Sequence, residues 1–182
     1  GTVDSGADDV GATNDAGAAS ACRQFKAGHY FRITDSTSRQ QDGLAGLGYS
    51  LGKGGPDFSN FVGIVWQIDW SMLETAPGVY DFSRLDSALD KVKSVGKHLR
   101  VKIMDRTFWL GCDPLRPFAP SWVPVVPGGT GSKFCVATVW TQSAMDDFIA
   151  LHIAIAKRYD NNDAFVGFTT EETATDVSYF RE

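Results

Sequence analysis

The chain has 182 residues, of which 43% are hydrophobic and 21% are charged, and its formal net charge is -5 at pH 7. This composition predicts a globular protein with one sizeable core and excludes a largely disordered chain. We expect no nucleic acid as a partner, because the acidic chain has no cluster of lysines and arginines. We also expect no membrane association, because no apolar run approaches the ~20 residues that cross a bilayer.

The first segment, residues 1–20, is rich in Gly, Ala, Asp, Ser and Thr and contains no aromatic residue. Such a segment buries little surface, so we interpret it as a tail or linker and assign residues 21–182 to one folded domain. His29 and Tyr30 are expected to end a first strand, where an isolated histidine is either a site residue or a structural one. The glycine-rich residues 43–56 lack the Walker spacing G-x-x-x-x-G-K-[ST] and are predicted to form a surface loop.

From residue 57 the pattern becomes regular. The apolar, β-branched run 61–66 predicts a buried strand, and residues 70–82 form a turn-bearing connection. Ser83 and Asp86 have the spacing of a capping box, and apolar residues then recur at helical spacing up to Gly96. The order is therefore strand, connection, helix.

A second unit begins with residues 98–104, where apolar and polar side chains alternate. Arg100 and Lys102 share one face of this strand, so the strand either lines the interior of a closed barrel or lies at a solvated edge. Ser143 and Asp146 repeat the capping-box spacing before an apolar helix that runs to about Tyr159, and residues 164–169 predict another strand. This alternation indicates a βα repeat with a parallel sheet.

Residues 105–142, between these elements, form an excursion rich in Trp, Pro and Gly that is long enough to be a functional loop. Cys112 and Cys135 bracket it and form either a disulfide of a secreted or periplasmic protein or two buried thiols. No C-x-x-C is present and the three histidines have no ligand spacing, so we expect no metal and no other cofactor.

The ends of the predicted strands carry the candidate site residues, because the carboxyl ends of barrel strands converge on one mouth. These residues are Asp69 and Trp70; Asp105, Arg106 and Trp109; and Glu171 and Glu172. Carboxylates beside exposed indoles suit a carbohydrate site, where acids react and flat rings stack on sugars. Trp122, in the excursion, is open between sugar stacking and packing, whereas Trp66 is expected in the core and Trp140 against the following helix. Alternatively, the two glutamates begin a surface helix.

Three stretches resemble the clan A (β/α)8 glycoside hydrolases, a group with cellulase-like and β-galactosidase-like members. They are WSMLETAPGVYDFSRLD (70–86), GKHLRVKI (96–103) and FIALHIAIAKRYDNNDAFVGF (148–168). The pattern W-x-x-L-E-x-x-x-G-x-Y-D-F-x-x-L-D is specific as a combination. The resemblance implies an α/β fold, the (β/α)8 TIM barrel, of which this chain supplies roughly the first four βα units.

The resemblance also implies a retaining hydrolase of a β-linked glycoside or polysaccharide, with a glutamate at the end of strand four as general acid and base. By position this residue is Glu171 or Glu172. The family has Asn-Glu at this point, whereas this sequence has Thr170-Glu171, so Thr170 is the candidate for the substrate contact that the asparagine makes.

The nucleophile of this family ends strand seven, and eight βα units need ~250 residues. We therefore expect two partners, the carbohydrate substrate and the C-terminal half of the barrel, which lies in the same or a separate chain. Two alternatives stay open. One is a non-catalytic carbohydrate-binding barrel, and the other is a lyase or inverting hydrolase that uses Asp69 or Asp105 as its second carboxylate.

Overall fold

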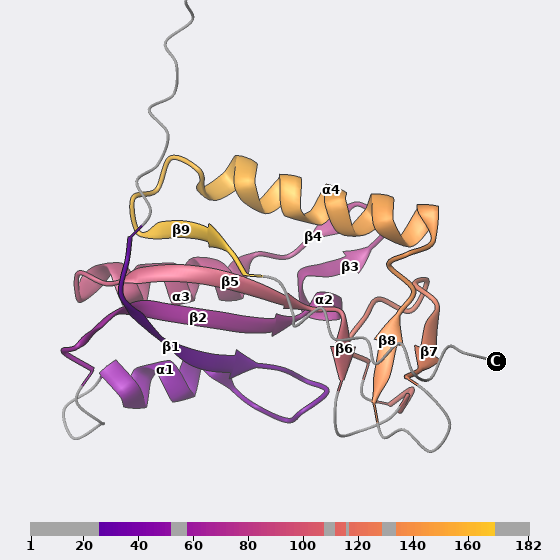
Figure 1. Ribbon diagram of the computed structural model, residues 1–182, viewed down its shortest axis with the longest axis horizontal. Helices are drawn as coiled ribbons and strands as arrows, with labels where there is room; N and C mark the ends of the chain where they lie inside the picture. Colours follow the sequence, from indigo (N-terminus) through magenta and orange to yellow (C-terminus); the bar gives the residue numbers. More distant parts are fainter. Residues whose placement is uncertain (1–25, 52–57, 108–111, 116, 129–133, 170–182) are drawn as a thin grey trace, which may run out of the picture.

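The computed structural model describes residues 26–51, 58–107, 112–115, 117–128 and 134–169. Its main sheet has the strand order β1-β2-β5-β9, and all neighbouring strands are parallel (Figure 1). These strands are β1 (His29–Asp35), β2 (Phe61–Asp69), β5 (His98–Met104) and β9 (Phe165–Phe168). The predicted mixed α/β fold with a parallel sheet is thus confirmed.

The three longest described helices connect these strands. They are α1 (Gly43–Leu51), α3 (Ser83–Ser94) and α4 (Gln142–Tyr159). Helix α1 contacts β1 and α3, whereas α3 contacts β2 and β5; α4 lies along β9 in Figure 1. The apolar side chains between sheet and helices are buried and form one core, which includes Ile64, Trp66, Ile68, Leu85, Leu89, Val101 and Leu151.

The opposite face of the sheet carries polar side chains. Alternation along β2 and β5 places Gln67, Arg100 and Lys102 on the face away from Trp66. The guanidinium carbon of Arg100 lies 4.4 Å from the centroid of the Tyr30 ring. Because β5 lies between β2 and β9, the alternative of an edge strand is wrong. The sheet of the described residues is open, so the (β/α)8 barrel stays a prediction.

Strand β1 begins at His29, so the prediction that His29 ends the first strand is wrong. The parallel pairing with β2 continues to the register pair Asp35 and Ile68, and Ile33 points into the core. The carboxyl end of β1 is therefore Asp35, an acid that the sequence analysis did not select.

The glycine-rich segment contains helix α1, so the prediction of a surface loop is wrong for residues 43–51. Asp42 Oδ1 accepts hydrogen bonds from the backbone N–H groups of Leu44 and Ala45, at 3.1 and 3.3 Å. Leu47 is fully buried in the core. The N-terminal acceptor and this burial outweigh the backbone entropy that glycine loses in a helix.

The two predicted capping boxes are not formed. Helix α3 begins at Ser83 after Phe82, helix α4 begins at Gln142 after Thr141, and neither preceding residue makes a side-chain capping bond. Asp146 instead accepts a hydrogen bond from the Gln142 side chain at 2.8 Å. The spacing was therefore right for a helix start but wrong for the capping contact.

Asp86, the other predicted capping acid, joins two helices instead. Its Oδ2 accepts a hydrogen bond from Arg158 Nη2 at 2.7 Å, and its Oδ1 accepts one from the Tyr159 hydroxyl at 2.8 Å. These contacts tie α3 to the C-terminal end of α4. Burial, followed by the hydrogen bond to Asp86, raises the pKa of Tyr159 above its usual range, so the phenol stays protonated and donates.

The long excursion after β5 contains a small antiparallel sheet in the order β6-β8-β7. Its strands are β6 (Arg106–Thr107), β7 (Val125–Pro127) and β8 (Cys135–Ala137). Cys112 and Cys135 form a disulfide, as one of the two alternatives for this pair predicted, and are not two buried thiols. Figure 1 places this sheet beyond the carboxyl ends of the parallel strands, so the excursion covers one end of the main sheet.

Candidate active site

Three aspartates mark the carboxyl end of the parallel sheet. Asp35 ends β1, Asp69 ends β2, and Asp105 directly follows β5. The three strands are adjacent and parallel, so these residues lie at one edge of the sheet. All three residues are buried, at 0%, 0% and 7% exposure. The question for each is which atoms its carboxylate binds.

The Asp69 carboxylate accepts its hydrogen bonds from the segment after β1. Ser36 Oγ donates at 2.9 Å and Thr37 Oγ1 at 3.3 Å, both to Oδ2. Ser38 donates through its backbone N–H to Oδ2 at 2.9 Å and through Oγ to Oδ1 at 3.1 Å. Burial raises the pKa of Asp69 and these donors oppose the rise. We therefore assign Asp69 the role of holding residues 36–38 against β2.

Trp70 lies in the core rather than at an open mouth. Its side chain is fully buried, and its ring centroid is 4.8 Å from that of Phe148. The indole Nε1 donates to Glu74 Oε2 at 2.8 Å. Because neither face of this indole is exposed, the structure gives Trp70 a packing role in place of the predicted substrate contact.

Asp105 and Arg106 pair with each other at the start of the excursion. Arg106 Nε donates to Asp105 Oδ1 at 2.9 Å, and Nη2 donates to Oδ2 at 3.1 Å. The backbone N–H of Ala137 donates to the Asp105 carbonyl at 2.8 Å, which fixes β8 at the end of β5. The opposite charges of this bidentate pair nearly cancel at the edge where the strands end.

Asp35 is bound in a similar way by Arg84 at the start of α3. Arg84 Nη2 donates to Asp35 Oδ1 at 2.6 Å and to Asp42 Oδ1 at 2.8 Å. The backbone N–H of Gly43 also donates to Asp35 Oδ1, at 3.0 Å. The hydrogen bond to Asp35 is the main cause that raises the pKa of Arg84. Asp35 thus joins β1, α1 and α3, and the signal in the sequence was an acid directly after an alternating strand.

The tryptophans divide between core, loop and surface. Trp66 is fully buried, as predicted, whereas Trp140, which was expected to pack against α4, is 51% exposed. Trp122 packs partly against the core, and its buried Nε1 has no hydrogen-bond partner in the structure. The buried Nε1 of Trp66 in the core also has no partner, so this feature alone does not mark a ligand contact.

Trp109, Thr170, Glu171 and Glu172 lie outside the described residues. The described part of the site therefore consists of three aspartates that are bound by hydroxyl groups or arginines, together with Trp122. We call Asp35, Asp69, Asp105 and Arg106 the polar rim, and each of its carboxylates accepts hydrogen bonds from donors within the chain.

No family model and no curated protein matches this chain. A solved structure of endo-glycoceramidase II from Rhodococcus sp., a cellobiose-like imidazole complex, matches with 20% identity and a TM-score of 0.51, over 79% of this chain and 38% of that one. The chain shares the fold of this enzyme over the matched part. The lactosyl-enzyme intermediate of the same protein matches with 20% identity, a TM-score of 0.49, and coverage of 76% and 38%.

A β-galactosidase from the psychrophilic Marinomonas ef1 matches with 14% identity and a TM-score of 0.45, over 81% of this chain and 22% of that one. The predicted resemblance to (β/α)8 glycoside hydrolases is thus confirmed for the fold by the endo-glycoceramidase. This chain spans 38% of the length of that enzyme. Activity, substrate and partners are therefore subjects for a proposal.

Proposed function

We propose that this chain is the N-terminal part of a retaining glycoside hydrolase that acts on a β-linked glycoside or polysaccharide. The observation that carries this proposal is the fold: a parallel sheet whose carboxyl ends bear the polar rim, in a chain that is similar to an endo-glycoceramidase solved as a cellobiose-like imidazole complex. In such sheets ligands bind at the carboxyl ends of the strands.

In this mechanism one carboxylic acid protonates the glycosidic oxygen while a second carboxylate attacks the anomeric carbon, and the sugar–oxygen bond breaks. The glycosyl-enzyme is then hydrolysed by water, which the first residue deprotonates. The two carboxyl groups stand ~5 to 5.5 Å apart in retaining enzymes. We assign the acid/base to the end of β9 and place the nucleophile outside this chain.

Between the two adjacent glutamates, we assign the acid/base role to Glu171. Glu171 directly follows Thr170, the position that corresponds to the asparagine of the Asn-Glu motif in the resembling family, and Glu172 is one position further on. This match to the motif favours Glu171.

The other predicted site residues take supporting roles in this proposal. Asp105 and Arg106 bind substrate hydroxyls at the rim, and Trp109, Trp122 and Thr170 contact the sugar. Asp69 is saturated with donors, and Asp105 is paired with Arg106. This favours a nucleophile from elsewhere over Asp69 or Asp105 as the second carboxylate.

The disulfide favours a secreted or periplasmic protein, because such bonds persist in oxidising compartments. In the described ranges, no helix combines the length and apolarity that a membrane span requires.

Mass spectrometry of the natural protein with and without reduction tests the assignment to a secreted or periplasmic protein. A disulfide between Cys112 and Cys135 in protein taken from the extracytoplasmic fraction is expected, and free thiols there would contradict the assignment.

The stereochemistry of the reaction tests the proposed mechanism. The full-length protein is incubated with a β-glycoside, and the first-formed product is followed by proton NMR before its anomers equilibrate. We expect the β anomer, because two displacements retain configuration. The α anomer would contradict the proposal in favour of an inverting enzyme, and saturable sugar binding without any turnover would favour the non-catalytic carbohydrate-binding protein.

A further inference from the structure

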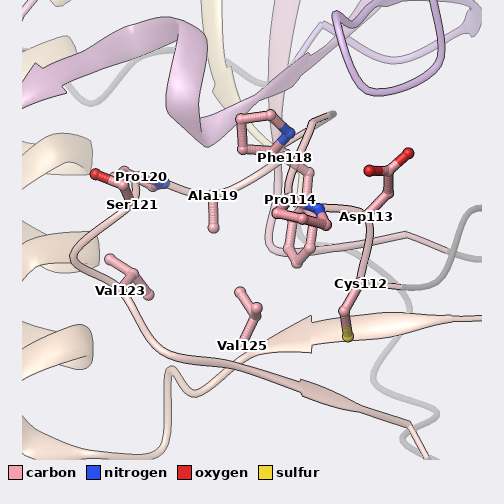
Figure 2. Close-up of a pocket in the computed structure, with 10 residues that line it drawn as sticks. Cys112, Asp113, Pro114, Phe118, Ala119, Pro120, Ser121, Val123 and Val125 are labelled. Atoms are coloured by element: carbon pink, nitrogen blue, oxygen red, sulfur yellow. The ribbon is translucent and has the colours of Figure 1, made fainter.

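A cavity of about 280 Å³ lies in the excursion between β6 and β7 (Figure 2). Its walls include the rings of Pro114 and Phe118 and the side chains of Val123 and Val125. In Figure 2 the side chains of Ala119 and Val125 point toward each other across this space. The cavity is thus apolar on several sides, and the proposed mechanism does not use it.

The cavity is attached to the edge where the parallel strands end. Ser71, two residues after Asp69, donates through its backbone N–H to the Phe118 carbonyl at 3.1 Å. Its hydroxyl donates to the Pro117 carbonyl at 2.8 Å. A group seated in the cavity would therefore lie beside the rim that carries the candidate site.

The walls are rigid before any ligand binds. Phe118, Ala119 and Val123 are 3%, 3% and 4% exposed and belong to the hydrophobic core. Three prolines of the lining restrict the backbone, and Cys112 in the wall is held to β8 by the disulfide. A preformed cavity loses little entropy when it binds a ligand.

The chemistry of the walls selects the ligand class. Among the lining residues of the described chain, Asp113 carries the formal charge, and its Oδ1 accepts a hydrogen bond from the Leu115 N–H at 2.9 Å. A carboxylate disfavours an anion, and the apolar walls disfavour any charged group. The volume lies at the low end of ligand cavities, near ~300 Å³, so it fits one ring or a short alkyl group.

We propose that this cavity binds an uncharged apolar group, which in the proposed function is the aglycone of the glycoside substrate. The identification as an aglycone rests on the proposed function, whereas the binding of an apolar group does not. The enzyme is then expected to prefer glycosides with an aryl or branched alkyl aglycone over methyl glycosides of the same sugar.

Two matched variants test the cavity in the full-length protein. Val125→Asp puts a charge into the cavity at a residue that is 40% exposed, and Val79→Asp puts the same charge on β4 (Val79–Tyr80) at a residue that is 55% exposed and outside the cavity. Binding of benzyl alcohol, an uncharged aryl alcohol with one ring, is measured by titration calorimetry. We expect at least tenfold weaker binding in Val125→Asp and no change in Val79→Asp, with unchanged circular dichroism in both.

The outcomes separate the two proposals. Failure of the unsubstituted protein to bind the aryl alcohol, or equal weakening in both variants, overturns the inference even where glycosides are hydrolysed. Binding that only Val125→Asp weakens, in a protein that hydrolyses no glycoside, supports the cavity and overturns the proposed function. Where hydrolysis occurs, Val125→Asp is expected to raise KM for the aryl glycoside and to leave KM for the methyl glycoside unchanged.

Discussion

Glu74 forms the hydrogen bonds that join Trp70 to Gly78, two residues of the sequence pattern shared with the glycoside hydrolases. It lies in β3 (Glu74–Ala76), follows α2 (Trp70–Leu73), and is 2% exposed. Its Oε2 accepts the Trp70 indole N–H at 2.8 Å, and its Oε1 accepts the backbone N–H of Gly78 at 2.9 Å. Gly78 has a φ of 71°, in the left-handed region that favours glycine. The spacing W-x-x-x-E-x-x-x-G therefore describes one hydrogen-bonded unit.

Replacing Glu74 is expected to destabilise the protein and to leave the contacts of the rim residues unchanged. In Glu74→Ala the buried indole N–H loses its acceptor, which costs about 1 to 3 kcal/mol in the free energy of unfolding. The matched control is Thr75→Ala, at the exposed next position, with an expected change within ~0.5 kcal/mol. Urea unfolding of the full-length protein measures both, and equal costs would contradict the role given to Glu74.

The sequence predicted which residues stand at strand ends but not how their side chains are used. Asp69, Asp105 and Arg106 were selected because they follow apolar strands, and they lie where expected. Their hydrogen-bond partners could not be predicted. Asp69 binds the segment Ser36–Ser38, which is distant in the sequence. The pairing of Asp105 with Arg106 depends on side-chain geometry. Trp70 was predicted to line the mouth because it follows a predicted strand. The short helix α2, in which Trp70 is buried, was not predicted from the sequence.

At the scale of elements, the disulfide is the main constraint on the excursion. Cys112 and Cys135 are 23 residues apart, and the bond joins the start of the loop to β8. In a chain-entropy estimate a loop of this length contributes about 3 kcal/mol. The double variant Cys112→Ser, Cys135→Ser is therefore expected to lower the free energy of unfolding by about 2 to 4 kcal/mol.

Chemical denaturation under oxidising and reducing conditions measures this contribution. Reduction is expected to destabilise the unsubstituted protein and to leave the double variant unchanged. Cys22→Ser is the control, because it removes a thiol and keeps the bond. A double variant as stable as the unsubstituted protein would show that the loop is held without the disulfide.

Strands β2, β5 and β9 and the two long helices could be predicted because apolar residues repeat at a period of two or near 3.6. Helix α1 was missed because glycine has a low helix propensity, and its start depends on Asp42 and on contacts with β1 and α3. The first capping box was wrong because Asp86 binds Arg158 and Tyr159, which are distant in the sequence. In the second, Asp146 binds the side chain of the nearby Gln142 instead. Tertiary contacts thus outweighed local preference at α1 and at Asp86.

At the scale of the whole molecule, α4 leaves one apolar face open. Met145, Ile149 and Ile153 follow one another at intervals of four residues and are 39%, 49% and 47% exposed. The proposed barrel would cover this face with its second half, because neighbouring helices of such a barrel pack together. An open sheet with a bare helix face fits a part of a larger fold.

A pair of lysine variants in the full-length protein tests whether the second half of the barrel packs on this face of α4. Ile149→Lys is expected to lower the free energy of unfolding by about 1 to 3 kcal/mol, because a covered isoleucine loses its burial. Val95→Lys, just after α3, starts from a similar exposure of 44% and is expected to change it by less than ~0.5 kcal/mol. Equal small effects would show that α4 faces solvent in the complete protein.

The most direct test of the account is the leaving-group dependence of Glu171→Gln in the full-length enzyme. A general acid matters most for a poor leaving group, so kcat/KM for alkyl glycosides should fall by ~10²- to 10⁴-fold. The value for an activated dinitrophenyl glycoside should change far less. Glu172→Gln serves as the control and should show no such difference. A loss that is equal for both leaving groups in Glu171→Gln, or a selective loss in Glu172→Gln, would contradict the assignment.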